Sequence, residues 1–208
     1  MTPPTLGIDL GTSGVRAVVL GGAGILAAGA TRLDPGDRHD PAALWAAVAG
    51  VLDGMDLSGV GALAVDGTSG TLLAVLADGT PAGRLSLYSD PGTVPARATA
   101  MLACPGTARV LHEADWIAGQ FSGLFDVTDW NNALKTGFDP VALAWRDGAG
   151  LPRVVAPGTA LGRVTPAAAR RFGLPTDAMV AAGTTDGCAS FLGTGADQVG
   201  DGVTALGS

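Results

Sequence analysis

The first thirty residues alternate apolar stretches with short turns rich in glycine and hydroxyl side chains. Three aliphatic runs stand out, at Leu6–Leu10, Val15–Leu20 and Ile25–Ala30. Runs of this length, bounded by turn residues, are typical of β-strands. The pattern therefore predicts three consecutive strands, of which the first two form a hairpin.

A helical pattern follows. Asp40 is a favourable N-cap and Pro41 suits the first helical position. Apolar residues then recur at helical spacing, namely Leu44, Trp45, Val48, Val51, Leu52 and Met55. Two further apolar runs, Val60–Val65 and Leu72–Leu76, predict strands.

Three strands, a helix and another strand is the element order of the ribonuclease-H-like core. The actin, sugar-kinase and heat-shock-chaperone ATPases share this core, and the chain resembles them in this respect. The expected fold class is α/β, with a mixed central sheet flanked by helices. The sequence has no internal repeat and no linker, so we expect residues 1–208 to form one domain.

The second half of the chain is less regular, and Pro91–Pro105 has no clear pattern. The residue types predict a helix over Val110–Ile117, a loop entering a helix over Asp126–Lys135, a helix from Thr165-Pro166 to Phe172, a strand over Met179–Ala182, a helix near Ala189–Leu192 and a strand over Val203–Leu206.

Composition narrows the class of protein. The 208 residues are 47% apolar and 15% charged, with a net charge of −7, which suits a folded domain with a large core. Lys135 is the sole lysine and no basic cluster exceeds two residues, so nucleic-acid binding is disfavoured. The two isolated cysteines, Cys104 and Cys188, form neither a disulfide framework nor a zinc motif. The sequence shows no signal peptide and no apolar run long enough to span a membrane, so we expect a cytoplasmic protein.

Three turns share one design, in which an apolar strand leads into a loop of Asp, Gly and Thr or Ser. They are Asp9–Gly14, Asp66–Thr71 and Gly183–Cys188. Ligands of open α/β sheets bind at such strand ends. The alternative is that these residue types simply favour turns. Because all three loops follow apolar strands, we expect them to line one site.

The first turn has the chemistry of a phosphate loop. Gly11 lets the backbone approach an anion, Thr12 and Ser13 donate hydrogen bonds to phosphate oxygens, and Asp9 is able to hold Mg²⁺, usually through water. Arg16 follows on the next strand and either reaches a phosphate or points into solvent.

Seven segments together resemble the N-terminal domain of the FGGY carbohydrate kinases, most similar to D-ribulokinase-like and xylulokinase-like members. They are GIDLGTSGVRAVVL, AVDGTSGTLLAV, LYSD, HEADWIAG, TDWNNALKTGFDP, APGTALGRV and AAGTTDGCASFLG, in the family's order. The resemblance implies phosphorylation of a polyol or ketose with ATP and Mg²⁺ as cofactors. D-ribulose is the favoured substrate, with D-xylulose and other polyols open.

The resemblance also implies roles for individual residues. It assigns the first phosphate loop to Asp9, Gly11, Thr12 and Ser13, and the start of a second phosphate loop to Gly207 and Ser208. Asp66, Thr68 and Ser69 lie at the sugar-binding floor. Asp186 is the catalytic aspartate, and Asp9 and Asp186 are the metal-binding candidates. A helix N-cap is the alternative role for Asp186.

Trp116 and Asn131 are further candidates for sugar contact, because a sugar presents hydroxyls and an apolar face. Trp130, Asn132 and Lys135 belong to the same group. Core packing is the alternative for Trp116, helix capping for the asparagines, and a solvated surface position for Lys135.

Two departures from the family bear on activity. The segment between Asp90 and His112 has about half the residues expected, which predicts that a helix over the sugar site is shortened or lost. The chain stops at Ser208, without the family's adenosine-binding C-terminal domain. We therefore expect a chain that is inactive by itself unless a second half is supplied in cis or in trans.

Two alternatives to a kinase stay open. The first is a truncated, non-catalytic sugar-binding or regulatory half-kinase. The second is an actin-like or chaperone-type ATPase, which does not require the DGTSG and DWNNALK segments. The sequence does not indicate an oligomeric state.

Overall fold

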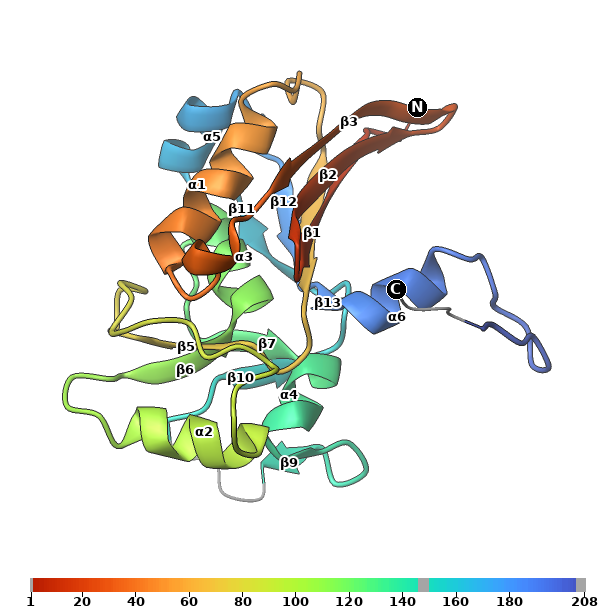
Figure 1. Ribbon diagram of the computed structural model, residues 1–208. Helices are drawn as coiled ribbons and strands as arrows, with labels where there is room; N and C mark the ends of the chain where they lie inside the picture. The colour runs from red at the N-terminus through yellow and green to blue at the C-terminus, as the bar shows by residue number, and fades with distance from the viewer. Residues whose placement is uncertain (1, 146–149, 205–208) are drawn as a thin grey trace.

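The computed structural model describes residues 2–145 and 150–204. Its first three strands form an antiparallel meander, as the sequence predicts (Figure 1). They are β1 (Thr5–Gly11), β2 (Gly14–Gly21) and β3 (Gly24–Arg32). A Cβ atom on Gly14 would lie 2.0 Å from the backbone oxygen of Thr31, so the tight turn after β1 requires glycine at this position.

The central sheet is mixed, as expected, and runs in the order β11-β12-β4-β1-β2-β3, with the short β13 also paired to β4. β4 lies parallel to β1, β12 and β13. The added strands are β4 (Ala62–Gly67), β11 (Ala160–Arg163), β12 (Met179–Ala181) and β13 (Thr184–Thr185). Because β13 continues beside the end of β4, segments far apart in the sequence meet at one edge of the sheet.

Three helices cover one face of this sheet: α1 (Pro41–Leu52), α3 (Glu113–Ser122) and α5 (Pro166–Phe172) (Figure 1). The predicted caps are confirmed, because the side chains of Asp40 and Thr165 accept hydrogen bonds from the first turns of α1 and α5. Under these helices Trp45, Phe121 and Phe172 pack with ring centroids 5.7–5.8 Å apart. This aromatic cluster joins all three helices to the main hydrophobic core.

Smaller elements form a second layer below the sheet in Figure 1, around the three two-stranded sheets β5–β6, β7–β10 and β8–β9. Its strands are β5 (Leu72–Val75), β6 (Arg109–His112), β7 (Val127–Asp129), β8 (Phe138–Asp139), β9 (Ala144–Trp145) and β10 (Arg153–Val155). The remaining helices are η1 (Pro35–Asp37), α2 (Val94–Leu102), α4 (Trp130–Thr136) and α6 (Asp186–Leu192).

Several predicted boundaries are wrong. The predicted helix over Val110–Ile117 is strand β6 followed by α3, because Val110 and Leu111 pair with β5 and only the residues after His112 turn helical. A short apolar run fits both periods, which explains the error. The loop predicted to enter α4 contains strand β7, and the helix predicted near Ala189–Leu192 begins at Asp186.

Two other segments complete the comparison with the sequence. The unpatterned segment Pro91–Pro105 contains α2, capped by Thr93, so a short helix is present there. Val203 and Thr204 do not form the predicted strand, and the rest of that prediction lies outside the described residues.

The longest helix is α1, with 12 residues. Among the described residues, no helix has the length and apolar character that crossing a membrane requires.

Candidate functional site

Three carboxylates from three separate segments meet at one edge of the central sheet. Asp9 on β1 and Asp66 on β4 are direct partners across parallel strands. β13 runs beside the end of β4 and leads directly into Asp186, the first residue of α6. The three side chains line an open cleft of about 660 Å³, together with the turn after β1. The structure therefore brings all three segments together at one cleft.

The carboxylates influence each other strongly. Burial, the charge of Asp9 with a hydrogen bond to it, and the charge of Asp186 raise the pKa of Asp66 to about 7. One carboxylate is partly neutralised, because Nη1 of Arg16 lies 2.9 Å from Oδ2 of Asp9. Arg16 thus lines the cleft from an exposed position on β2. The cleft holds an excess of negative charge, which favours a cation or a hydrogen-bond donor there.

The local structure around Asp186 leaves its carboxylate at the cleft. The N-cap of α6 is Thr185, whose hydroxyl accepts from the backbone N–H of Cys188 at 3.4 Å. Asp186 is therefore not the cap residue, and its Oδ1 accepts only from the adjacent Gly187 N–H, at 2.7 Å, among the hydrogen bonds of the described residues.

The hydroxyl turn after β1 is exposed to the same cleft. Thr12 and Ser13 occupy the two positions between Gly11 and Gly14, which face each other across the hairpin. Gly11, Thr12 and Ser13 all line the cleft. Their exposed hydroxyls and backbone N–H groups are suited to bind an anion beside the carboxylates.

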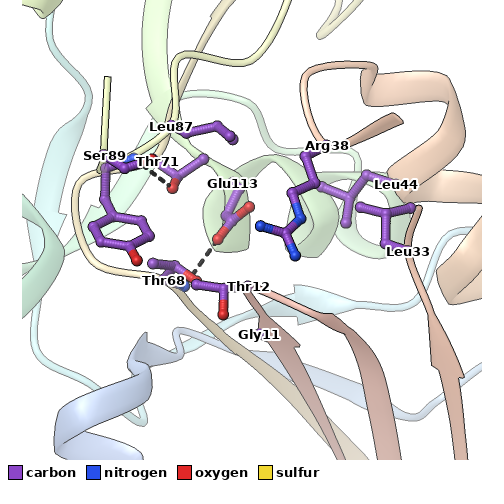
Figure 2. A pocket seen from close by; sticks show the side chains of 11 residues that line it. Gly11, Thr12, Leu33, Arg38, Leu44, Thr68, Thr71, Leu87, Ser89 and Glu113 are labelled. Carbon is purple, nitrogen blue, oxygen red and sulfur yellow. Dashed lines mark hydrogen bonds between the residues drawn. The ribbon is translucent and has the colours of Figure 1, made fainter. Parts of the chain in front are cut away.

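The loop after β4 borders a second hollow, a cavity of about 60 Å³ (Figure 2). The backbone N–H of Thr68 donates to Oε1 of Glu113 at 2.8 Å, and its hydroxyl donates to the backbone oxygen of Leu10 at 3.1 Å. Thr68 and Glu113 both line the cavity, and Gly11 and Thr12 line the cavity and the cleft alike. The two hollows are therefore adjacent at the turn after β1.

The structure does not add Ser69 to either set of lining residues, although it follows Thr68 directly. Its hydroxyl oxygen is buried and finds no hydrogen-bond partner within the described part of the chain. Such an oxygen is free to bind a water molecule or a ligand hydroxyl.

Trp116 is a correction to the sequence analysis. Its side chain is buried in the main core, and Nε1 donates to the backbone oxygen of Gly79 at 3.0 Å. The assignment of Trp116 to sugar contact is therefore wrong, because both its ring and its N–H are occupied by the core.

The polar residues of α4 divide into two groups. Asn132 is buried, and its Nδ2 donates to Asp129 at 2.6 Å, so it stabilises the helix start. Asn131 instead extends toward β13 and donates from Nδ2 to Oγ1 of Thr184 at 2.9 Å. This bond links Asn131 to Thr184, which lies two residues before Asp186 in the chain. Lys135 is exposed in the last turn of the helix.

The remaining predicted site residues, Gly207 and Ser208, lie outside the described residues. Sequence reasoning missed Glu113 and Arg38, which line the cavity. The one available signal is that Glu113 is the only glutamate of the chain, and it lies within the HEADWIAG segment.

The donor set is compatible with a magnesium ion. Among the described residues, no group of three or more His, Cys, Asp or Glu side chains is arranged to hold a metal. Mg²⁺, however, is commonly bound by one or two carboxylates, with water and phosphate oxygens completing its shell. Asp9 and Asp186 supply two carboxylates, and their effect on the pKa of Asp66 indicates negative charge that a cation would neutralise.

The fold is similar to that of several solved sugar kinases. The chain is similar to xylulose kinase from Rhodospirillum rubrum, with a TM-score of 0.78 and 22% identity over 92% of this chain and 52% of that protein. It is also similar to xylulose kinase from Bifidobacterium adolescentis, with a TM-score of 0.79 and 16% identity over 94% of this chain and 56% of that protein.

A gluconate kinase from Lactobacillus acidophilus gives a TM-score of 0.74 at 14% identity, over 90% of this chain and 49% of the kinase. The chain thus spans about half the length of the kinases it resembles. No family model matches the sequence.

Proposed function

We propose that this chain is the sugar-binding half of an ATP-dependent carbohydrate kinase, with a ketopentose as its substrate and D-ribulose as the leading candidate. The observation that carries the proposal is the meeting of Asp9, Asp66 and Asp186 beside the exposed hydroxyl turn. The likeness to sugar kinases supports the reaction class, and the resemblance of the DGTSG and DWNNALK segments supports the sugar.

In the proposed reaction, Asp186 accepts the proton of the attacking sugar hydroxyl and orients its oxygen toward the γ-phosphorus of ATP. Thr12 and Ser13 hold the phosphates with their hydroxyl and backbone N–H groups. Asp66, Thr68 and Ser69 bind the sugar, and Asn131 positions the loop of Asp186 through Thr184. Asp9 and Asp186 are the residues that would hold Mg²⁺, which would supply positive charge to the transferred phosphoryl group.

Turnover also requires an adenosine-binding wall opposite this cleft. Because the chain spans about half of the similar kinases, we propose that a second half supplies this wall in cis or in trans. The expected cytoplasmic location remains a prediction.

One alternative is a sugar-binding or regulatory half-kinase without catalysis. The open cleft favours it, since phosphoryl transfer is efficient only where water is excluded.

The test combines calorimetric sugar binding with a coupled assay of ADP release, on this chain and on any longer polypeptide that contains it. D-ribulose, D-xylulose and glycerol are compared with Mg-ATP present. We expect Asp186→Asn to lower turnover by about 10²–10⁴-fold while sugar affinity changes little.

Asp78→Asn is the matched control, because Asp78 is an exposed turn residue outside both hollows. It should leave binding and turnover unchanged. Ketopentose binding without ADP release under every condition would favour the non-catalytic alternative. If D-ribulose, D-xylulose and glycerol all fail to bind, the proposal is contradicted.

A further inference from the structure

The cavity beside the cleft contains a guanidinium group without a partner. Arg38 follows the short helix η1 and lines the cavity. Figure 2 shows its guanidinium extending toward Glu113 and Thr12. Nε of Arg38 is buried and unbonded, and the structure gives this side chain no hydrogen bond or ion pair among the described residues. A buried donor without an acceptor is costly, so this arrangement indicates a ligand oxygen.

Glu113 provides a second donor in the same cavity. Its side chain is buried and anchored by the Thr68 N–H, which donates to Oε1. Burial raises its pKa to about 8, so the side chain is a neutral carboxylic acid at pH 7. A protonated carboxyl whose first oxygen accepts from Thr68 retains an O–H group that is free to donate.

The charges nearby favour a neutral ligand over an anionic one. The adjoining cleft is already lined by three carboxylate side chains, those of Asp9, Asp66 and Asp186. A ligand carboxylate in the cavity would add a further negative charge to this region. A carbonyl oxygen instead accepts two hydrogen bonds and adds no charge, so it matches two donors that line the same cavity.

The size of the cavity agrees with one end of a sugar. About 60 Å³ exceeds the space one water molecule needs, yet it is small enough that a whole pentose would extend out of it. The cavity joins the cleft at Gly11 and Thr12, so a ligand that enters the cavity continues toward Asp186. An open-chain ketose has its carbonyl near one end and a primary hydroxyl at the other, which matches this arrangement.

We propose that Arg38 and Glu113 bind the carbonyl oxygen of the ketose and thereby distinguish ketoses from the corresponding alditols. This inference rests on the proposed function and names the groups that select the substrate. An alditol presents a hydroxyl at that position. Its oxygen accepts from both donors as a carbonyl does, but its own O–H proton then needs an acceptor, which neither Arg38 nor a protonated Glu113 supplies.

The first test measures binding by calorimetry, with D-ribulose, ribitol and D-ribonate as probes. We expect the unmodified chain to bind D-ribulose at least about tenfold more tightly than ribitol, the effect of one buried O–H group without an acceptor. Arg38→Met and Glu113→Leu should reduce this ratio to within about twofold. Glu113→Gln should retain it, because an amide also accepts from Thr68 and donates into the cavity. Arg84→Met is the control, since Arg84 is exposed and lines neither hollow.

A second measurement needs no variant and so does not depend on how the variants fold. Because Glu113 is the only glutamate, ¹³C labelling of glutamate carboxyls gives one carboxyl signal from this chain. D-ribulose should shift this signal and ribitol should shift it little.

The outcomes separate the two proposals. If none of the three probes binds, D-ribulose fails as the substrate of the proposed function and the carbonyl assignment fails with it. If D-ribulose and ribitol bind equally, or if D-ribulose leaves the glutamate signal unmoved, the carbonyl assignment is refuted while the kinase proposal stands. If D-ribonate binds most tightly of the three, the carbonyl assignment is refuted and the cavity is an anion site.

Discussion

The substitution Glu113→Gln should stabilise the protein, and the gain should increase with pH. The pKa of Glu113 rises from its ordinary value of 4.5 to about 8, chiefly through burial and against the favourable Thr68 hydrogen bond. The folded state therefore binds a proton that the unfolded state releases above pH 4.5. Stability from this group is greatest at low pH and is lost as the pH rises toward 8.

The magnitude follows from the size of the shift. Each pH unit between the two pKa values costs about 1.4 kcal/mol, so the penalty is about 3 kcal/mol at pH 7 and about 5 kcal/mol above pH 8. Glutamine has nearly the same shape, preserves the acceptor for the Thr68 N–H and does not ionise. It should therefore remove the penalty without creating a cavity.

The assay is urea unfolding of the original chain and of Glu113→Gln at pH 5, 7 and 8.5, followed by tryptophan fluorescence. We expect a difference of under ~1 kcal/mol at pH 5 and ~3 kcal/mol at pH 7. Asp78→Asn serves as the control, because it also removes a carboxylate but from an exposed turn. A difference between the proteins that does not change with pH, or a glutamate ¹³C signal that titrates near pH 4.5, would refute the reasoning.

Three other substitutions test the fold around the site. His112 is buried with both ring nitrogens unbonded among the described residues, and burial lowers its pKa to about 3. Below pH 6.5 only the unfolded state gains a proton at this residue, so the stability of the protein decreases as the pH is lowered. This loss is roughly 3 kcal/mol between pH 7 and 4, and His112→Leu should abolish it in urea unfolding. Gly183→Ala should prevent folding or lower Tm by at least ~10 °C in calorimetry, since its Cβ would lie 1.7 Å from the backbone oxygen of Val65, whereas Gly187→Ala has open space and should match the original protein. Arg97→Leu should cost roughly 3 kcal/mol or more in urea unfolding, because Nη1 and Nη2 donate three buried or partly buried hydrogen bonds; an unchanged midpoint would contradict this.

The parts of the fold that the sequence predicts best are those stabilised by neighbouring residues. The strands of the meander alternate with local turns, and the caps Asp40 and Thr165 lie next to the helices they begin. The positions of Asp9 and Asp66 near strand ends were predicted for the same reason, since Asp66 directly follows an apolar run and Asp9 lies near the end of one. Their direct pairing depends on the parallel register of β1 and β4, which no local pattern encodes.

The parts that the sequence did not predict depend on distant partners. Trp116 is a residue type that suits sugar contact, but its Nε1 donates a hydrogen bond to the backbone oxygen of Gly79, which is 37 positions earlier. Glu113 is oriented by Thr68, 45 positions away, and only the fold places Arg38 against the same cavity. The prediction that Val110 begins a helix was wrong because the pairing of β6 with β5 outweighs local propensity.

The alternation of β1 explains why the site is accessible and also incomplete. Leu6, Ile8 and Leu10 face the helices that cover the core, so Asp9 necessarily points to the opposite face. Asp66 follows the same rule on β4, and α6 is the helix that contacts this side of both strands. The carboxylates are thus partly buried but line a cleft that is open to a substrate and to water. Under the proposed function, sugar binding needs only side chains of this chain, whereas phosphoryl transfer also needs the exclusion of water, so binding and turnover are expected to be separable.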